Sequence, residues 1–317
     1  MKTFITLLLV LMYFLTGCNS GIFIDELITE IPDTCIVEDN KSYRVNFDSE
    51  DWDILNIYNM EYFSLKIYDL DGNFKKDYLP LENNETAIIH CESTYYKFRI
   101  EKRDRRSMDI ICEKNLNNSL EDFKIEIGNK YIRKTIDVSL KPTRKFVLDK
   151  VEYDFSKDFY YSEDIIEQVD GMNVYNSGNE TITLNFYPFK DSKRKIEFYP
   201  DNNAMFNNID KYLGYDLPQI TIPDIVNGKP VLNDTKVTFG LKEQSFRTGR
   251  VDKDLIININ VKPGEKKNCI IYNYIEEYHV NYKVHASNPD TGEELVFTGR
   301  ISSAEPFDYI SIPQNQK

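Results

Sequence analysis

The sequence of 317 residues lacks most of the motifs on which common enzymes depend. It contains no CxxC pair, phosphate-binding glycine loop, dinucleotide fingerprint, Gly-x-Ser-x-Gly elbow or His-Glu-x-x-His motif. Only three histidines and five cysteines are available as zinc ligands, and they are scattered along the chain. We therefore expect no enzyme, no metal and no cofactor. The remaining enzymatic alternative is a glycan-processing enzyme that uses two of the many carboxylates.

Glycine and proline are also scarce, at 13 and 12 residues, which excludes collagen-like and low-complexity chains. Basic residues number 39 against 52 acidic ones, so the formal charge of −13 argues against a nucleic acid partner. Aromatic residues are abundant, with 22 tyrosines and 19 phenylalanines in a chain that is 41% hydrophobic. Because aromatic and β-branched side chains suit a pleated, half-buried surface, the composition predicts an all-β protein.

The N-terminus has the form of an export signal. Met1-Lys2 precedes an apolar run from Phe4 to Leu15, which is shorter than the ~20 residues of a membrane-spanning helix. The run ends in Leu15-Thr16-Gly17-Cys18, which resembles the lipobox of bacterial lipoproteins, and the composition resembles lipoproteins of Bacteroides-type bacteria. The resemblance implies a signal peptide over residues 1–17, a lipid on Cys18 and a tether over 18–34. The membrane would then be a partner through this lipid, and the protein would be exported to the outer membrane, facing either the periplasm or the cell surface.

Residues 35–142 are predicted to form an immunoglobulin-like β-sandwich, because short strand-like runs alternate with turn residues and no helical period occurs. The expected strands are Ser64–Tyr68, Phe74–Leu79, Thr86–His90, Tyr95–Glu101, Met108–Cys112, Phe123–Ile127 and Tyr131–Leu140. The order of the later strands resembles the BACON-type modules of Bacteroides surface proteins. Cys91 and Cys112 fall in strands that we expect to be neighbours, so they are the candidate disulfide, with free buried thiols as the alternative.

Lys141-Pro142-Thr143 marks a boundary, and residues 150–317 are predicted to form an elongated antiparallel β domain. Strict alternation of apolar and polar residues over 181–186, 255–262 and 278–286 indicates half-buried strands. One face of the last of these runs carries Tyr278, Val280, Tyr282, Val284 and Ala286. Residues 153–170 show no period, and we expect an irregular segment with a short helix there.

This second half contains an Asn- and Thr-rich segment, Val174–Leu184, and a later Pro-Gly turn, Val261–Lys267. Together they resemble the aerolysin family, most of all its epsilon-toxin and mosquitocidal-toxin branch. The resemblance implies a long twisted sheet over residues 172–300 and, in family members, a central amphipathic segment that becomes the membrane hairpin of a pore. The corresponding residues 201–250 contain Pro218, Pro223 and Pro230. Because proline cannot donate to a strand ladder, this segment argues against a pore.

Two surface features are candidate ligand sites. A basic stretch over residues 97–106 could bind phosphate, sulfate or an acidic sugar, since arginine forks grip such oxyanions. Its candidate residues are Arg99, Lys102, Arg103, Arg105 and Arg106. Aromatic rings, if exposed, could stack on sugars, and this feature comprises Trp52, Tyr58, Tyr62, Tyr95, Tyr96, Tyr160 and Tyr161. Of these, Trp52, Tyr95 and Tyr96 are the candidate binding residues. The alternatives are a solvated turn neutralised by nearby acids for the first feature and core packing for the second.

These observations favour a non-enzymatic, lipid-anchored protein of the cell envelope or cell surface that binds a glycan or a protein ligand. The alternative is an aerolysin-like, membrane-active module of the pore-forming type. Residues 201–250 discriminate between the two hypotheses. A buried or loop-like segment favours the binding protein, whereas an amphipathic hairpin lying on the sheet favours the membrane-active one.

Overall fold

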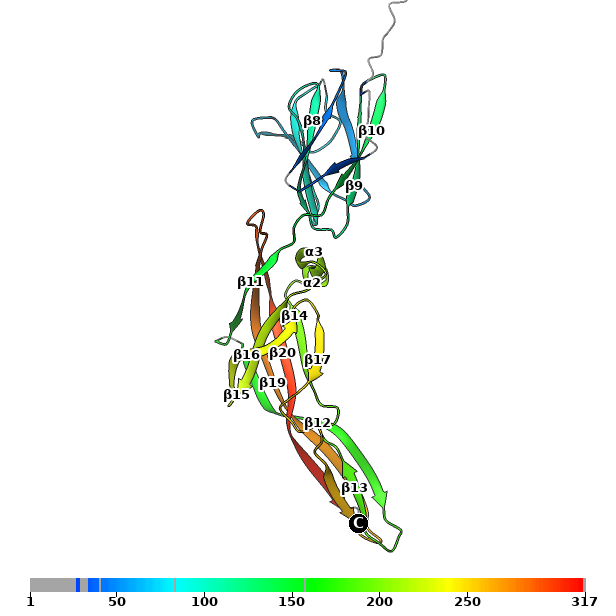
Figure 1. Cartoon of the computed structure of the whole chain (residues 1–317), viewed down its shortest axis with the longest axis vertical. Helices are drawn as coiled ribbons and strands as arrows, with labels where there is room; N and C mark the ends of the chain where they lie inside the picture. Colours follow the sequence, from blue (N-terminus) through cyan, green and yellow to red (C-terminus); the bar gives the residue numbers. More distant parts are fainter. Residues whose placement is uncertain (1–26, 29–33, 40, 83, 157, 316–317) are drawn as a thin grey trace, which may run out of the picture. The chain divides into compact units, whose positions relative to one another are not determined.

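The computed structural model describes residues 27–28, 34–39, 41–82, 84–156 and 158–315, and these residues confirm the prediction of an all-β protein (Figure 1). The chain divides into two compact units, Met1–Arg144 (unit 1) and Lys145–Lys317 (unit 2). Cys18 and the lipobox lie outside the described residues. Within the described ranges, no helix has the length and apolar character that a membrane span requires.

Unit 1 is a sandwich of two sheets. One sheet has the strand order β1-β10-β9-β3 and the other has the order β2-β8-β7-β6-β4-β5. Their bounds are β1 Cys35–Val37, β2 Ser42–Asn46, β3 Asp53–Tyr58, β4 Ser64–Tyr68, β5 Phe74–Lys76, β6 Ala87–Glu92, β7 Tyr96–Lys102, β8 Ser107–Asn115, β9 Glu121–Gly128 and β10 Arg133–Leu140. All pairs are antiparallel except β1 with β10, which is parallel.

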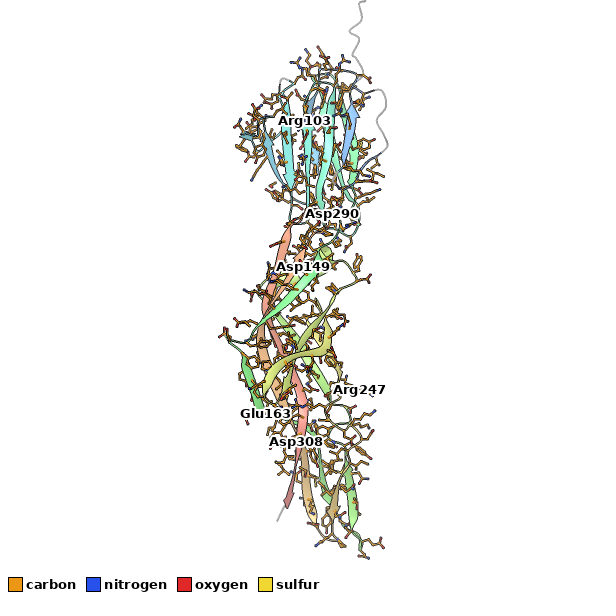
Figure 2. All side chains as sticks on the ribbon, turned by 60° about the vertical axis from the view of Figure 1, so that its left-hand side comes forward. Arg103, Asp149, Glu163, Arg247, Asp290 and Asp308 are labelled. Carbon is orange, nitrogen blue, oxygen red and sulfur yellow. The ribbon has the colours of Figure 1, made fainter. Side chains whose placement is uncertain are left out.

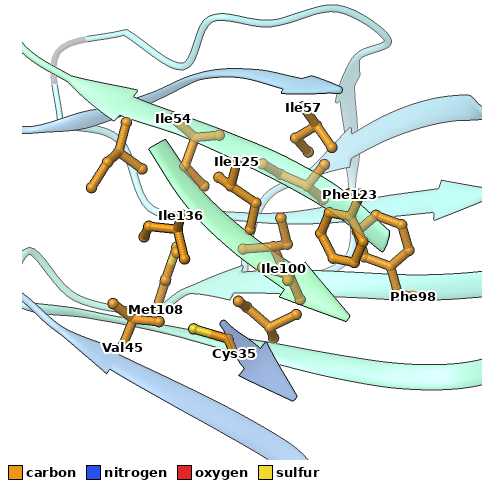
Figure 3. Packing of buried hydrophobic residues seen from close by; sticks show 14 of the residues in the cluster. Cys35, Val45, Ile54, Ile57, Phe98, Ile100, Met108, Phe123, Ile125 and Ile136 are labelled. Atoms are coloured by element: carbon orange, nitrogen blue, oxygen red, sulfur yellow. The ribbon is translucent and has the colours of Figure 1, made fainter. Parts of the chain in front are cut away.

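The core of unit 1 fills the space between the two sheets, because apolar side chains alternate with polar ones along each strand. Ile100 and Met108 from one sheet meet Ile125 and Ile136 from the other (Figure 3). Phe98 stacks on Phe123 across the sandwich, with ring centroids 4.1 Å apart. This interdigitation of two inner faces is what gives a two-sheet domain its own stable core.

The candidate disulfide between Cys91 and Cys112 is wrong. Both cysteines are buried free thiols, and so are Cys35 and Cys269. Cys91 lies on β6 and Cys112 on β8, and Phe98 of β7 pairs with both of them. Two strand spacings therefore separate the cysteines, about 9.6 Å, which exceeds the ~7 Å that a disulfide can bridge between Cα atoms.

Unit 2 is built on a long twisted sheet with the strand order β11-β19-β20-β14-β17, to which β12 adds beside β19. The strands are β11 Val147–Asp154, β12 Tyr160–Tyr175, β13 Ile182–Phe186, β14 Lys193–Pro200, β15 Gln219–Val226, β16 Lys229–Thr238, β17 Glu243–Arg247, β18 Ile257–Val261, β19 Lys266–Ser287 and β20 Glu294–Asn315. Strands β19 and β20 have 22 residues each and pair along almost their whole length. This hairpin makes unit 2 elongated (Figure 1).

Two short helices, α2 (Asn203–Asn207) and α3 (Ile209–Leu213), lie near one end of unit 2. They cover an aromatic core in which Phe239 makes edge contacts with Phe206, Tyr282 and Phe297. The predicted inner face of Tyr278–Ala286 is confirmed, because all five alternating residues are buried. Towards the other end, β13 and β18 form a separate two-stranded sheet whose side chains pack on Cys269 and Ile271 of β19.

The expected irregular segment over residues 153–170 is wrong, because most of it belongs to β11 and β12. The sequence shows no period of two there for a physical reason. Both faces of β12 are largely exposed, so burial imposes no alternation of apolar and polar residues. Register shifts at Ser162/Ile165 and Gln168/Asp170 interrupt whatever alternation is left.

Candidate functional site

The discriminating segment, residues 201–250, contains a β-hairpin formed by β15 and β16. Its turn residues Asn227 and Gly228 both have positive φ, at 52° and 70°, as a two-residue hairpin turn of type I′ requires. Pro223 lies opposite Leu232 and Pro230 opposite Ile225. The prolines are compatible with this hairpin because each strand of a two-stranded sheet is an edge strand. The prolines therefore do not prevent this segment from forming a hairpin, which removes the reason for which we expected the segment to argue against a pore.

The β15–β16 hairpin is amphipathic. Ile220, Ile222 and Val237 are buried, whereas Gln219 and Lys236 on the opposite face are exposed. The hairpin forms a two-stranded sheet of its own and, among the described residues, shares no ladder with the long sheet of unit 2. Side chains hold it against the long sheet instead, so its release would not break any strand ladder of that sheet.

A polar cluster attaches the hairpin to the sheet, and we call Arg194, Asp224, Tyr153 and Tyr278 the docking cluster. The guanidinium of Arg194 on β14 donates to the Asp224 carboxylate at 2.5 Å and to the carbonyl of Pro223 at 2.7 Å. Tyr278 donates to the same Pro223 carbonyl at 2.6 Å, and Tyr153 donates to the Thr221 carbonyl at 2.8 Å. Two carbonyls and one carboxylate of β15 are therefore held by three side chains of the long sheet.

Arg194 and Tyr278 of the docking cluster are buried, Tyr153 and Asp224 are half-buried, and the Arg194 guanidinium remains charged. Arg194 is 5% exposed, and burial alone would lower its pKa. Tyr278, Asp224 and Glu305 outweigh burial and raise the pKa of Arg194 above its ordinary value, so the guanidinium keeps its proton. Burial raises the pKa of Tyr278 to about 12 and also raises that of Tyr153, so both phenols remain donors at neutral pH. Thr235 of β16 donates to the second Asp224 oxygen at 3.0 Å.

Where β11 and β14 no longer pair with it, the long sheet is reduced to β12, β19 and β20, and we call this part the narrow end. The narrow end has two open edges. From Ile165 to Tyr175, β12 pairs only with β19 among the described strands, and β20 beyond Ala304 likewise pairs only with β19. Figure 2 labels Glu163 on β12 and Asp308 on β20, one on each edge strand. Ile166 and Met172 on β12 are exposed, as is Ile310 on β20. Unpaired edges with apolar side chains are templates for pairing with another chain.

Two of the aromatic ligand candidates are not at the surface. Trp52 is 0% exposed, stacks on Phe47 with centroids 3.7 Å apart and donates its indole N–H to the Arg105 carbonyl. Tyr96 is equally buried, while Tyr95 is half-buried. The hypothesis of an exposed ring is therefore wrong for Trp52 and Tyr96, and the alternative of core packing is confirmed for both. Large aromatic side chains reach the core here because they fill the space between two sheets.

Lys102, a candidate of the basic stretch, is also a core residue. Its side chain is fully buried, with the ammonium 4.3 Å from the centre of a Trp52 ring. The ammonium donates to the Trp52 carbonyl at 2.7 Å and to Asp53 at 3.0 Å. Burial is the largest influence on its pKa and lowers it, against the opposing effect of Asp53. Lys102 therefore ties β7 to β3 and does not face a ligand.

The other basic candidates are at least partly exposed, and three of the four form ion pairs with acidic residues. Arg99 pairs with Glu101 and Glu113, and Arg103 also pairs with Glu101 (Figure 2 labels Arg103). Arg106 pairs with Glu50 at 2.8 Å. Arg105 and Arg106 line a shallow hollow of about 560 Å³. Asp104 and Glu50 line the same hollow, so carboxylates compete with any bound anion there.

One sequence signal for the β15–β16 hairpin was present. Asn227-Gly228, preceded by the alternating run Gln219–Ile222, is the strongest short-range signature of a hairpin. The residues that dock it had no such signal. Arg194 and Asp224 are 30 positions apart, and neither lies in a recognisable motif.

No protein-family model and no curated protein matches this sequence. Among solved structures, a lamprey immune protein is similar with 10% identity and a TM-score of 0.34, over 87% of this chain and 98% of that one. An aerolysin-like protein of Bombina maxima has 11% identity and a TM-score of 0.27, over 53% and 98% of the two chains. The parasporin-2 toxin of Bacillus thuringiensis has 9% identity and a TM-score of 0.26, over 62% and 76%. With scores this low, functional conclusions depend on the geometry of the chain itself.

Proposed function

We propose that this chain is a membrane-active protein in which the β15–β16 hairpin leaves the long sheet and inserts into a lipid bilayer. The proposal rests on one observation, namely that this hairpin is separate from the long sheet. Within the part of the chain that the structure describes, its two strands pair only with each other, and side chains attach it to the long sheet. A hairpin of this kind can move as one piece because its own ladder stays intact.

The dimensions of the hairpin suit a bilayer. Strands β15 and β16 have eight and ten residues, close to the roughly 9–11 residues of a tilted transmembrane strand. Release from the sheet would expose Ile220, Ile222 and Val237, which are now covered. Near the turn, Leu232 is already 53% exposed and Val231 is also exposed. Exposed apolar surface of this kind is stable only against lipid or another protein.

A single hairpin cannot cross a membrane, because its outer edges would carry unsatisfied backbone groups. Several copies would have to close a barrel. The open edges of the narrow end supply a way to bring copies together, since β12 and β20 are both antiparallel to β19 and therefore run parallel to each other. In a side-by-side arrangement, β12 of one copy would meet β20 of the next. Such a contact joins different surfaces of the two copies, and it produces a ring when the rotation closes.

The test uses a crosslink that prevents the hairpin from leaving. A Cβ atom at Gly228 would lie 3.8 Å from a ring carbon of Tyr161 on β12. Cysteines at both positions, Tyr161→Cys and Gly228→Cys, are therefore close enough for a short bismaleimide. The described native cysteines are buried and should not react, and using residues 19–317 removes Cys18.

We expect the uncrosslinked double variant to release dye from liposomes and to give an oligomer on an SDS gel, and the crosslinked protein to do neither. The uncrosslinked protein carries the same substitutions and is the matched control for strain at the Gly228 turn. Equal leakage before and after crosslinking would show that the hairpin does not insert. Absence of leakage from the unmodified chain would contradict membrane activity altogether.

A further inference from the structure

The outer face of the β1-β10-β9-β3 sheet in unit 1 carries a groove of about 510 Å³. Its volume lies within the range of about 300–1,000 Å³ that is typical of small-ligand sites. The residues that matter for its chemistry are Tyr58, Met60, Asp122, Lys124, Asp137 and Ser139. None of them belongs to the basic stretch or to the hairpin of unit 2.

The floor of the groove is set by strand register. Tyr58 on β3 pairs with Lys124 on β9, and Lys124 pairs with Asp137 on β10, so these three side chains form one row on one face. Asp122 and Ser139 form the next row. Directly opposed residues have Cβ atoms about 5 Å apart, so the two rows present an aromatic ring, two carboxylates, an ammonium and a hydroxyl over a short distance.

These side chains are held in place before any ligand arrives. Lys124 pairs with Asp137 at 2.9 Å, and Ser139 donates to Asp122 at 2.5 Å. The Tyr58 hydroxyl donates to Glu126 at 2.6 Å, which fixes the orientation of a ring that is 46% exposed. Ordered side chains lose little entropy on binding, so a ligand would meet a preorganised surface.

We propose that this groove binds a neutral oligosaccharide. The Tyr58 ring offers a flat apolar surface for the C–H face of a sugar, and the Met60 thioether beside it is fully exposed. A carboxylate has about four acceptor sites, so Asp122 and Asp137 can accept from sugar hydroxyls in addition to their present partners, while Lys124 can donate. Two carboxylates face one ammonium in the groove, so an anionic sugar would be repelled. The ligand class is therefore neutral and hydroxyl-rich.

The experiment measures binding of the whole purified chain to immobilised neutral hexasaccharides of glucose, galactose, mannose and N-acetylglucosamine, beside sialylated and sulfated glycans. We expect binding to at least one neutral hexasaccharide and none to the anionic set. Tyr58→Ala should weaken that binding at least tenfold, because it removes the stacking surface. Tyr58→Phe keeps the ring but loses the Glu126 bond, and should weaken binding only about twofold to threefold.

The matched control is Tyr131→Ala, which removes another exposed tyrosine of unit 1 that does not line the groove. It should leave binding unchanged, and thermal melting of each variant reports whether the fold is kept. Binding to anionic glycans alone, no binding to any neutral hexasaccharide, or equal loss in Tyr131→Ala would each overturn the proposal. Because these readouts concern unit 1 and need no membrane, they succeed or fail independently of the liposome experiment.

Discussion

Replacing Arg194 by methionine removes the charge that docks the β15–β16 hairpin while keeping much of the side-chain volume. The change leaves the Asp224 carboxylate and the Pro223 carbonyl without their guanidinium donor. Removing one partner of a buried ion pair destabilises by about 3–5 kcal/mol. We take the lower end, about 3 kcal/mol, because the Asp224 side chain is 19% exposed and water can reach it. At about 1.4 kcal/mol per factor of ten, the undocked hairpin should be populated about a hundredfold more.

Hydrogen exchange of the backbone amides measures this opening directly. An isolated two-stranded hairpin is only marginally stable in water, so its ladder opens readily once it is undocked. In Arg194→Met, amides of β15 and β16 should therefore exchange about a hundredfold faster, while the amides of β9 and β10 in unit 1 should not change. The double variant Arg194→Met/Asp224→Leu should recover most of the protection, since a hydrophobic pair can replace a buried ion pair. Unchanged exchange in β15 and β16 would refute the assigned role of the docking cluster. Arg133→Met, which removes an exposed pair with Glu126, is the matched control.

Three further predictions concern the docking phenols, the core tryptophan and the N-terminal cysteine. Burial raises the pKa of Tyr278 to about 12. The contribution of Tyr278 to docking is therefore complete below about pH 10 and is lost as the pH rises through about 12. An ultraviolet titration should show this phenol ionising after the exposed tyrosines, and ionisation together with them would contradict its burial. Trp52→Ala should lower the free energy of unfolding by about 3–5 kcal/mol in a urea titration, because it opens a cavity beside Lys102. A decrease in this free energy of less than about 1 kcal/mol would place the ring outside the core. We also propose that Cys18 carries the lipid, so Cys18→Ser should move the protein from the membrane fraction to the soluble fraction, and its retention in the membrane fraction would count against the lipobox.

The sequence predicted the parts of the fold that depend on local alternation. The inner face of Tyr278–Ala286 is an example, because a half-buried strand must alternate and the period survives in the residues. The same rule fails for β12, which is exposed on both faces and carries no period. The order of strands in a sheet also cannot be read from local sequence patterns. For that reason we expected Cys91 and Cys112 to lie on neighbouring strands, whereas β7 lies between the strands that carry them.

Side-chain environment could not be predicted from residue type. A tryptophan or tyrosine suits both a sugar-binding surface and a core, and Trp52 and Tyr96 are in the core. The basic stretch was equally ambiguous, because only Glu101 among its partners lies in the stretch and the others come from elsewhere in unit 1. Glu113 reaches Arg99 from β8, and Glu50 reaches Arg106 from the segment before β3. Pairing of this kind depends on three-dimensional proximity, which spacing along the chain does not encode.

The position of β20 in the long sheet has a consequence for how the chain is made. β20 lies between β19 and β14 and pairs with both, yet it is the last of the sheet's strands to be synthesised. The centre of unit 2 therefore cannot assemble on a nascent chain until β20 has emerged, and its pairing with β14 joins residues about a hundred positions apart. Sheets that depend on such distant contacts fold slowly. Late folding would keep unit 2 unfolded during synthesis, which is the state that a protein needs if it is to be threaded across a membrane.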